Sequence, residues 1–154
     1  MFKFIATAAI AAASVIAPAH SYQNGGVELW GALDEAGVEI TTLNCANHGI
    51  DNAYGFFVPS ERDIYICEDV AVSDAQQWET IRHEAVHAAQ HCVNPNMNSV
   101  LMSQRWLENN AHESDASFIM QAYDESDWLI ELEAFTLMRY SNQDIARLVD
   151  EACN

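Results

Sequence analysis

The stretch from Ser73 to Cys92 constrains the fold more than any other part of the chain, because it predicts one long and largely buried helix. Ser73 and Gln76 have the spacing of a capping box, and Asn94-Pro95 ends the helix. Apolar residues occupy most sides of this helix, namely Ile81, Ala85, Val86, Ala88 and Ala89. A helix that is apolar on most sides is a buried one, so we expect the rest of the domain to pack around it.

The middle of this helix carries two histidines and a glutamate in the sequence His83-Glu84-Ala85-Val86-His87, an HExxH motif. Residues four apart on a helix share a face, with Cβ atoms about 6 Å apart, so both imidazoles can bind one Zn²⁺. Glu84 then lies beside the metal, where it can act as a general base toward water. The alternative is a hydrogen-bonded pair of core histidines, but burying these polar side chains without a partner is costly. The motif predicts one Zn²⁺ per chain, with His83 and His87 as ligands and Glu84 as the catalytic group.

The third ligand has to come from another part of the chain. His91 is eight residues from His83, about 12 Å along the helix axis, so one ion cannot bind both. We expect His91 beside the site or at the surface. The segment 128–135 places Glu131 and Glu133 in an otherwise apolar helix, where a buried carboxylate needs a cation. These two side chains point about 200° apart, so only one can bind the ion, and periodicity does not distinguish them.

The HExxH helix, followed about forty residues later by Glu131-Leu132-Glu133-Ala134, resembles the gluzincin branch of zinc metallopeptidases, and most closely its small minimal members. In members with an E-x-x-A segment, the Glu three residues before the Ala is the third zinc ligand. The resemblance therefore implies Glu131, with Glu133 as the alternative. The Asp that often follows this Ala is Phe135 here, so a partner for a zinc-binding histidine has to come from elsewhere.

The resemblance also implies a small zincin-like fold and the hydrolysis of peptide bonds. Substrate would pair in extended form with an edge strand before the active-site helix, and residues 63–67 match that strand by position. A Tyr or His usually stabilises the oxyanion in this family. The candidates for that role are His112, Tyr123 and Tyr140. An aspzincin, with Asp124 or Asp127 as the third ligand, is a rival that leaves the enzyme class unchanged.

Local patterns along the chain predict an α+β fold, in which strands come first and helices follow. A hairpin over 54–67 gives a short antiparallel sheet, and 38–43 is a further strand. Helices are expected over 27–36, 73–92, 99–109, 114–123, from Ser126 or Asp127 to Tyr140, and from Ser141 or Asn142 to Cys153.

The N-terminus and the cysteines both indicate export. Lys3 precedes an uncharged apolar run of about 14 residues, too short to span a membrane. Small residues follow, so we expect a signal peptide over 1–19, cleaved after Ala19 or Ser21, and a secreted or periplasmic protein. Four cysteines in a small exported domain indicate two disulfides, and of three possible pairings we favour Cys45–Cys67 with Cys92–Cys153. No CxxC spacing supports a cysteine-rich zinc site.

Length and charge limit the remaining possibilities. The chain has 154 residues, which suits a single domain over 22–154. It carries 23 acidic residues against 6 basic ones, a formal charge of -17, so nucleic acids and anionic membranes are excluded as partners. A peptide or protein substrate is expected, and basic peptides suit the charge. The alternative function is a secreted zinc-binding or disulfide-stapled binding protein without turnover.

Overall fold

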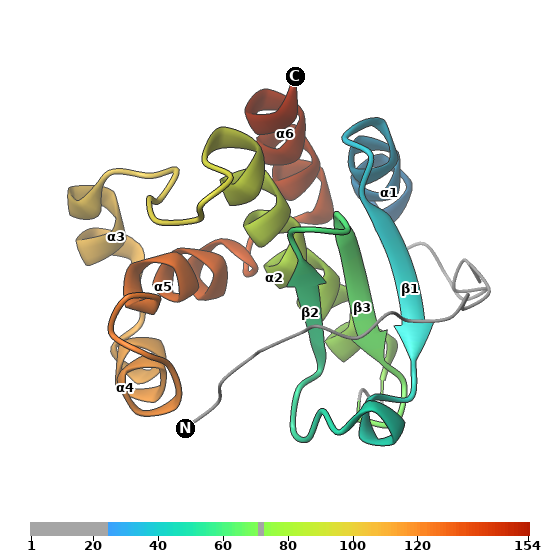
Figure 1. Ribbon diagram of the computed structural model, residues 1–154. Coiled ribbons are helices and arrows are strands. Elements are labelled where there is room, and N and C mark those ends of the chain that lie inside the picture. Colours follow the sequence, from blue (N-terminus) through green and yellow to red (C-terminus); the bar gives the residue numbers. More distant parts are fainter. Residues whose placement is uncertain (1–24, 71–72) are drawn as a thin grey trace.

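The computed structural model describes residues 25–70 and 73–154, and the predicted signal peptide lies outside these residues. In chain order the elements are α1 (Gly26–Glu35), β1 (Glu39–Leu43), the 3₁₀ helix η1 (Cys45–His48), β2 (Gly55–Val58), β3 (Asp63–Cys67), α2 (Asp74–Val93), α3 (Gln104–Asn110), α4 (Glu113–Ala122), α5 (Trp128–Leu137) and α6 (Asn142–Cys153) (Figure 1). The α+β class predicted from the sequence is confirmed.

The three strands form one sheet in the order β1-β3-β2. The expected hairpin is present, because β2 pairs with β3 in antiparallel fashion, with Phe57 opposite Ile64. The expectation of a purely antiparallel sheet is wrong, since β1 pairs with β3 in parallel and places Ile40 beside Ile64. The alternating pattern of β1 identifies a strand, but it carries no information about direction or partner.

The strand order also corrects the prediction of an edge strand at residues 63–67. Those residues form β3, which is the central strand and has a partner on each side. The edge strand directly before β3 in the chain is β2, and it is the strand nearest to α5 (Figure 1). A central strand has no free backbone groups to offer an extended ligand, whereas an edge strand does.

Both favoured disulfides are present. Cys45 is the first residue of η1, close to the end of β1, and is bonded to Cys67, the last residue of β3, so this disulfide holds the parallel pair of strands together. Cys92 lies at the end of α2 and is bonded to Cys153 at the end of α6. The second disulfide therefore anchors the long central helix to the last one.

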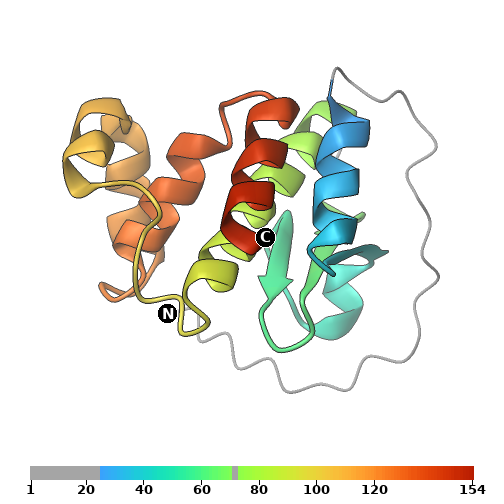
Figure 2. The ribbon, with the colours of Figure 1, turned by 90° about the horizontal axis from the view of Figure 1, so that it is seen from above.

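Helix α2 is central to the packing, as its apolar pattern predicts. It contacts β2, β3, α5 and α6, and α1 packs against α6. Figures 1 and 2 show α3, α4 and α5 grouped together, away from α1 and β1. The buried core residues from these elements include Leu29, Leu33, Ile64, Val86, Ala89, Ala134, Ile145 and Val149.

Several helix ends differ from the predicted bounds. The helix expected over 99–109 begins only at Gln104, where the Ser103 hydroxyl accepts a hydrogen bond from the N–H of Trp106. The helix expected to reach Tyr140 ends at Leu137. Among the described residues, none of the helices combines the length and apolar character needed to cross a membrane.

Candidate metal centre

Helix α2 positions the first two functional side chains. Ser73 caps its N-terminus by accepting a hydrogen bond from the N–H of Gln76, and the helix then runs without interruption for 20 residues. His83 and His87 lie one turn apart on this rigid element, and they are only 9% and 7% exposed. Their Nε2 atoms approach to 3.2 Å. Two imidazole nitrogens that face each other in a buried place need a proton or a metal between them.

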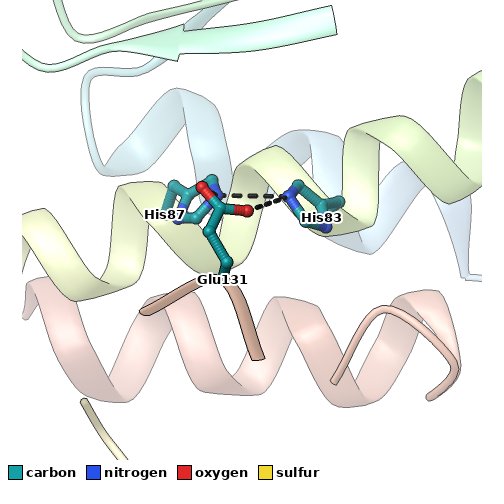
Figure 3. A group of neighbouring side chains, drawn as sticks. All are labelled: His83, His87 and Glu131. Carbon is teal, nitrogen blue, oxygen red and sulfur yellow. Dashed lines mark hydrogen bonds and ion pairs between the residues drawn. The ribbon is translucent and has the colours of Figure 1, made fainter. Parts of the chain in front are cut away.

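Helix α5 brings Glu131 to these histidines. Its Oε2 lies 3.4 Å from the Nε2 of His83, and its Oε1 lies 3.6 Å from the Nε2 of His87. Figure 3 shows the carboxylate pointing from α5 toward both rings on α2. Glu133 is fully buried but contacts other partners, so of the two glutamates the structure brings only Glu131 to the histidines. The packing of α5 on α2 therefore distinguishes Glu131 from Glu133, which the periodicity of the sequence did not.

The three side chains fit a tetrahedral zinc site in spacing and in chemistry. Their ligand atoms all lie within 4.8 Å of one another, and the pairwise separations above are 3.2–3.6 Å. Bonds of about 2.05 Å at tetrahedral angles place ligand atoms about 3.3 Å apart. Oε2 of Glu131 is buried and has no hydrogen-bond partner. A buried carboxylate oxygen without a donor is costly, and a cation at this point would satisfy it.

The electrostatics of the cluster favour a cation. Burial raises the pKa of Glu131, but the adjacent His87 and His83 outweigh burial and hold that pKa well below its usual range. Burial lowers the pKa of His87, but the Glu131 carboxylate and the charge of Glu84 outweigh it and raise that pKa to about 9. In the metal-free protein the site therefore holds a proton where a metal ion would supply positive charge.

Glu84 is beside the cluster and is 6% exposed. Burial raises its pKa above the ordinary value, while the charges of His83 and His87 and a hydrogen bond from the backbone N–H of Phe57 oppose that rise. Phe57 belongs to β2, so the edge strand holds the carboxylate of α2. A glutamate next to the three ligand atoms, but not among them, can accept and release a proton.

Of the three oxyanion candidates, the structure brings Tyr123 to the site. Burial, followed by the negative charges of Glu131 and Glu84, raises the pKa of Tyr123, so its phenol keeps its proton and can donate it in a hydrogen bond. The indole N–H of Trp128 donates to the carbonyl of Tyr123 at 3.1 Å and fixes its backbone. His112 is exposed at the start of α4.

Tyr140 is 42% exposed and lies against the Trp106 ring rather than at the site. His91 is near the site without belonging to it: its ring lies 5.8 Å from that of Phe57. Asp124 and Asp127 are exposed between α4 and α5, and the described residues show no metal-ligand grouping that includes them. The aspzincin alternative therefore has no geometric support.

Sequence reasoning missed the residue that contacts the second ring nitrogen of His87. Nδ1 of His87 lies 2.8 Å from Oε1 of Gln90, which is fully buried. Gln90 in turn donates to Glu133. Phe135 packs edge-on against the His83 ring at 4.7 Å and offers it no hydrogen bond. The signal was a polar residue one turn after His87, on the face of the helix that carries both histidines.

Arg82 helps to hold α2 in register with the C-terminal helices. Its Nε donates to the carbonyl of Met138 and its Nη1 to the side chain of Asn142. Arg139 pairs with Asp115 on α4. Both arginines thus make structural contacts, Arg82 with a carbonyl and an amide and Arg139 with a carboxylate.

Comparisons of this chain with protein-family models, with curated proteins and with solved structures give no match. The function is therefore argued from the site alone.

Proposed function

We propose that this protein is an exported zinc-dependent peptidase of the gluzincin type. The observation that carries the proposal is the convergence of His83, His87 and Glu131 within 4.8 Å, with the buried Glu84 beside them. A site that only stores zinc has no need for Glu84. Zinc bound by these three residues would supply a Lewis acid and lower the pKa of a water ligand to about 7.

Two residues of the chain would have the remaining catalytic roles, proton transfer and stabilisation of the oxyanion. Glu84 accepts a proton from the attacking water and later delivers it to the nitrogen of the leaving amine, so the proton count balances over the cycle. The Tyr123 hydroxyl donates a hydrogen bond to the carbonyl oxygen as negative charge develops on it. The water oxygen forms the new C–O bond, the C–N bond breaks, and a carboxylate and a protonated amine are released.

Substrate is proposed to pair with the outer edge of β2. This edge replaces residues 63–67, which were expected from the sequence to pair with substrate. None of the described strands pairs with that edge, and the Phe57 N–H on it already faces Glu84. An extended peptide added there would pass directly in front of the general base. The strong negative charge of the chain favours peptides that carry basic residues.

Two features support export. The first 19 residues have the pattern of a signal peptide. All four cysteines are joined in disulfides, which persist in oxidising compartments.

The experiment that tests the proposal combines metal analysis with peptide cleavage. Wild-type protein with its disulfides formed should hold about one zinc per chain and cleave members of a mixed peptide library. Glu84→Gln should retain the zinc and lose turnover by at least about 10²-fold. The exposed Glu79 on the same helix provides the control, because Glu79→Gln should retain both. Zinc without cleavage in wild type would indicate a zinc-binding protein, and absence of zinc would overturn the site.

A further inference from the structure

We propose that Gln90 and Glu133 act together as positioning residues, which fix the tautomer and orientation of His87 so that its Nε2 is free to bind the metal. This inference deepens the proposed zinc site and rests on it. The sequence left open which residue is the partner of a zinc-binding histidine. We assign that role to the neutral Gln90, which is hydrogen-bonded to the buried Glu133.

Glu133 is fully buried on α5. Its Oε1 accepts a hydrogen bond from the N–H of Met102 at 2.6 Å, and its Oε2 accepts one from the N–H of Leu101 at 2.9 Å. Backbone N–H groups can only donate, so both oxygens of Glu133 are held as acceptors. The carboxylate is thereby fixed in place by the segment between α2 and α3.

The fixed carboxylate sets the orientation of the Gln90 amide. Nε2 of Gln90 lies 2.8 Å from Oε2 of Glu133 and 3.1 Å from the carbonyl oxygen of Ile130. Both are acceptors, so they take the two N–H donors of the amide group. Rotating the amide by 180° would place its oxygen against two acceptors in a buried place. That arrangement costs roughly 1–3 kcal/mol for each unsatisfied group, so the observed orientation prevails.

The oriented amide then sets the proton on His87. Oε1 of Gln90 faces Nδ1 of His87 at 2.8 Å, and an amide oxygen can only accept. Nδ1 of His87 must therefore carry a proton. In the neutral ring the other nitrogen, Nε2, is left with its lone pair, and this atom faces His83 and Glu131. The direction of each hydrogen bond follows from the one before it, from the backbone of Leu101 and Met102 to the metal-binding nitrogen.

This arrangement differs from a histidine paired directly with a carboxylate. The negative charge of Glu133 reaches His87 only through the Gln90 amide, and Phe135 stands where the related peptidases often have an acid. We expect Gln90 to supply orientation with less added basicity than a carboxylate in direct contact would give.

The first test is the substitution Gln90→Met, which keeps the length of the side chain and removes its donor and acceptor. The expected result is zinc binding 10–100-fold weaker than wild type, the usual range for loss of such a partner, measured by competition with a chelator. Gln104→Met is the matched control, because Gln104 is exposed on α3 and should leave affinity unchanged. Wild-type affinity in Gln90→Met would overturn the inference.

A second measurement uses wild-type protein and does not depend on how any variant folds. Long-range proton–nitrogen NMR spectra of the zinc-loaded protein should show His87 with its proton on Nδ1 and the metal on Nε2. A proton on Nε2 would overturn the inference. Failure of wild type to bind zinc would overturn the site and the inference together, whereas zinc binding without peptide cleavage would overturn only the peptidase proposal.

Discussion

Two carboxylates on α5, two residues apart, have opposite surroundings. Glu131 faces two imidazoles and keeps one buried oxygen without a hydrogen-bond donor. Glu133 accepts three hydrogen bonds and has no free oxygen to offer a metal. The first is therefore suited to bind a cation, and the second to hold structure.

Exchanging each glutamate for its amide should separate these roles. Glu131→Gln should weaken zinc binding by more than about 100-fold, because it removes a direct ligand, while the metal-free fold remains intact. Glu133→Gln should lower the free energy of unfolding by about 2–4 kcal/mol, because one of its acceptors becomes a donor facing other donors. Zinc titration and urea unfolding of both variants measure these effects. Equal effects of the two substitutions on zinc binding would contradict the assignment.

The raised pKa of His87 predicts how zinc affinity depends on pH. In the metal-free protein this pKa is about 9 against an ordinary value of 6.5, so at neutral pH a proton must leave before zinc binds. Apparent zinc affinity should rise by about tenfold per pH unit toward pH 9. The metal-free fold behaves oppositely: the protonated ring stabilises it fully below pH 6.5, and this stability is lost as the pH rises through 9. Affinity and melting temperature at pH 6.5, 7.5 and 8.5 test both directions, and flat profiles would contradict the prediction.

At the residue level, sequence was most informative where spacing alone determines geometry. The i, i+4 relation of His83 and His87 required nothing beyond a helix. Choosing between Glu131 and Glu133 required the rotation of α5 against α2, which is a tertiary property. Gln90 was missed because a polar residue in an apolar helix indicates some partner without naming it.

At the element level, the contact of α1 with the Trp78 ring of α2 depends on a glycine. A Cβ atom on Gly26 would lie 2.8 Å from the Trp78 ring, closer than such atoms are found. Gly31 on the same helix has open space around its Cβ position. Helix propensity alone favours Ala over Gly at both positions by about 1 kcal/mol. At Gly26 the packing against Trp78 therefore determines whether an alanine stabilises or destabilises the fold.

The two glycines therefore predict opposite outcomes. Gly31→Ala should raise the free energy of unfolding by about 0.5–1 kcal/mol. Gly26→Ala should lower it by about 1–3 kcal/mol, because the Trp78 ring or α1 has to shift. Denaturant unfolding of the two variants beside wild type measures both. Stabilisation by Gly26→Ala would show that Trp78 moves freely, contrary to its 5% exposure.

Helices and strands could be predicted from the sequence where a local pattern of residues specifies them. Caps and apolar periodicity located most of the helices. Alternation located β1 and β3, and an aromatic run located β2. The favoured Cys45–Cys67 disulfide implied that β1 lies beside β3. The parallel direction of this pair was not predictable, because it is set by the closure of the whole sheet across the intervening β2. The start of α3 at Gln104 was also missed, since the N–H groups of Leu101 and Met102 donate to Glu133 instead of taking part in a helical turn.

At the scale of the whole molecule, charge repulsion works against compactness. The chain has 23 acidic and 6 basic residues. Ion pairs such as Arg139–Asp115 and Arg147–Asp144 offset little of this repulsion, because exposed pairs contribute about 0–1 kcal/mol each. The excess negative charge is therefore left to counterions in solution.

Salt should consequently stabilise the fold. Raising sodium chloride from 10 mM to 500 mM shortens the screening length from about 30 Å to about 4 Å, which weakens long-range repulsion more than contact pairs. We expect the melting temperature to rise by several degrees, with a similar rise in potassium chloride. An uncharged osmolyte at equal osmolality serves as the control. A fall in melting temperature would mean that the few ion pairs outweigh the repulsion.

The outer edge of β2, which pairs with none of the described strands, affects the behaviour of the protein at high concentration. A strand edge that is open to an extended peptide is equally open to the same edge of another copy, and such contacts seed aggregation. Mutual repulsion between highly negative molecules keeps these edges apart at neutral pH. Near the isoelectric point of about 4.3 that protection disappears, so acidified concentrated solutions should form strand-linked oligomers before the individual domains unfold.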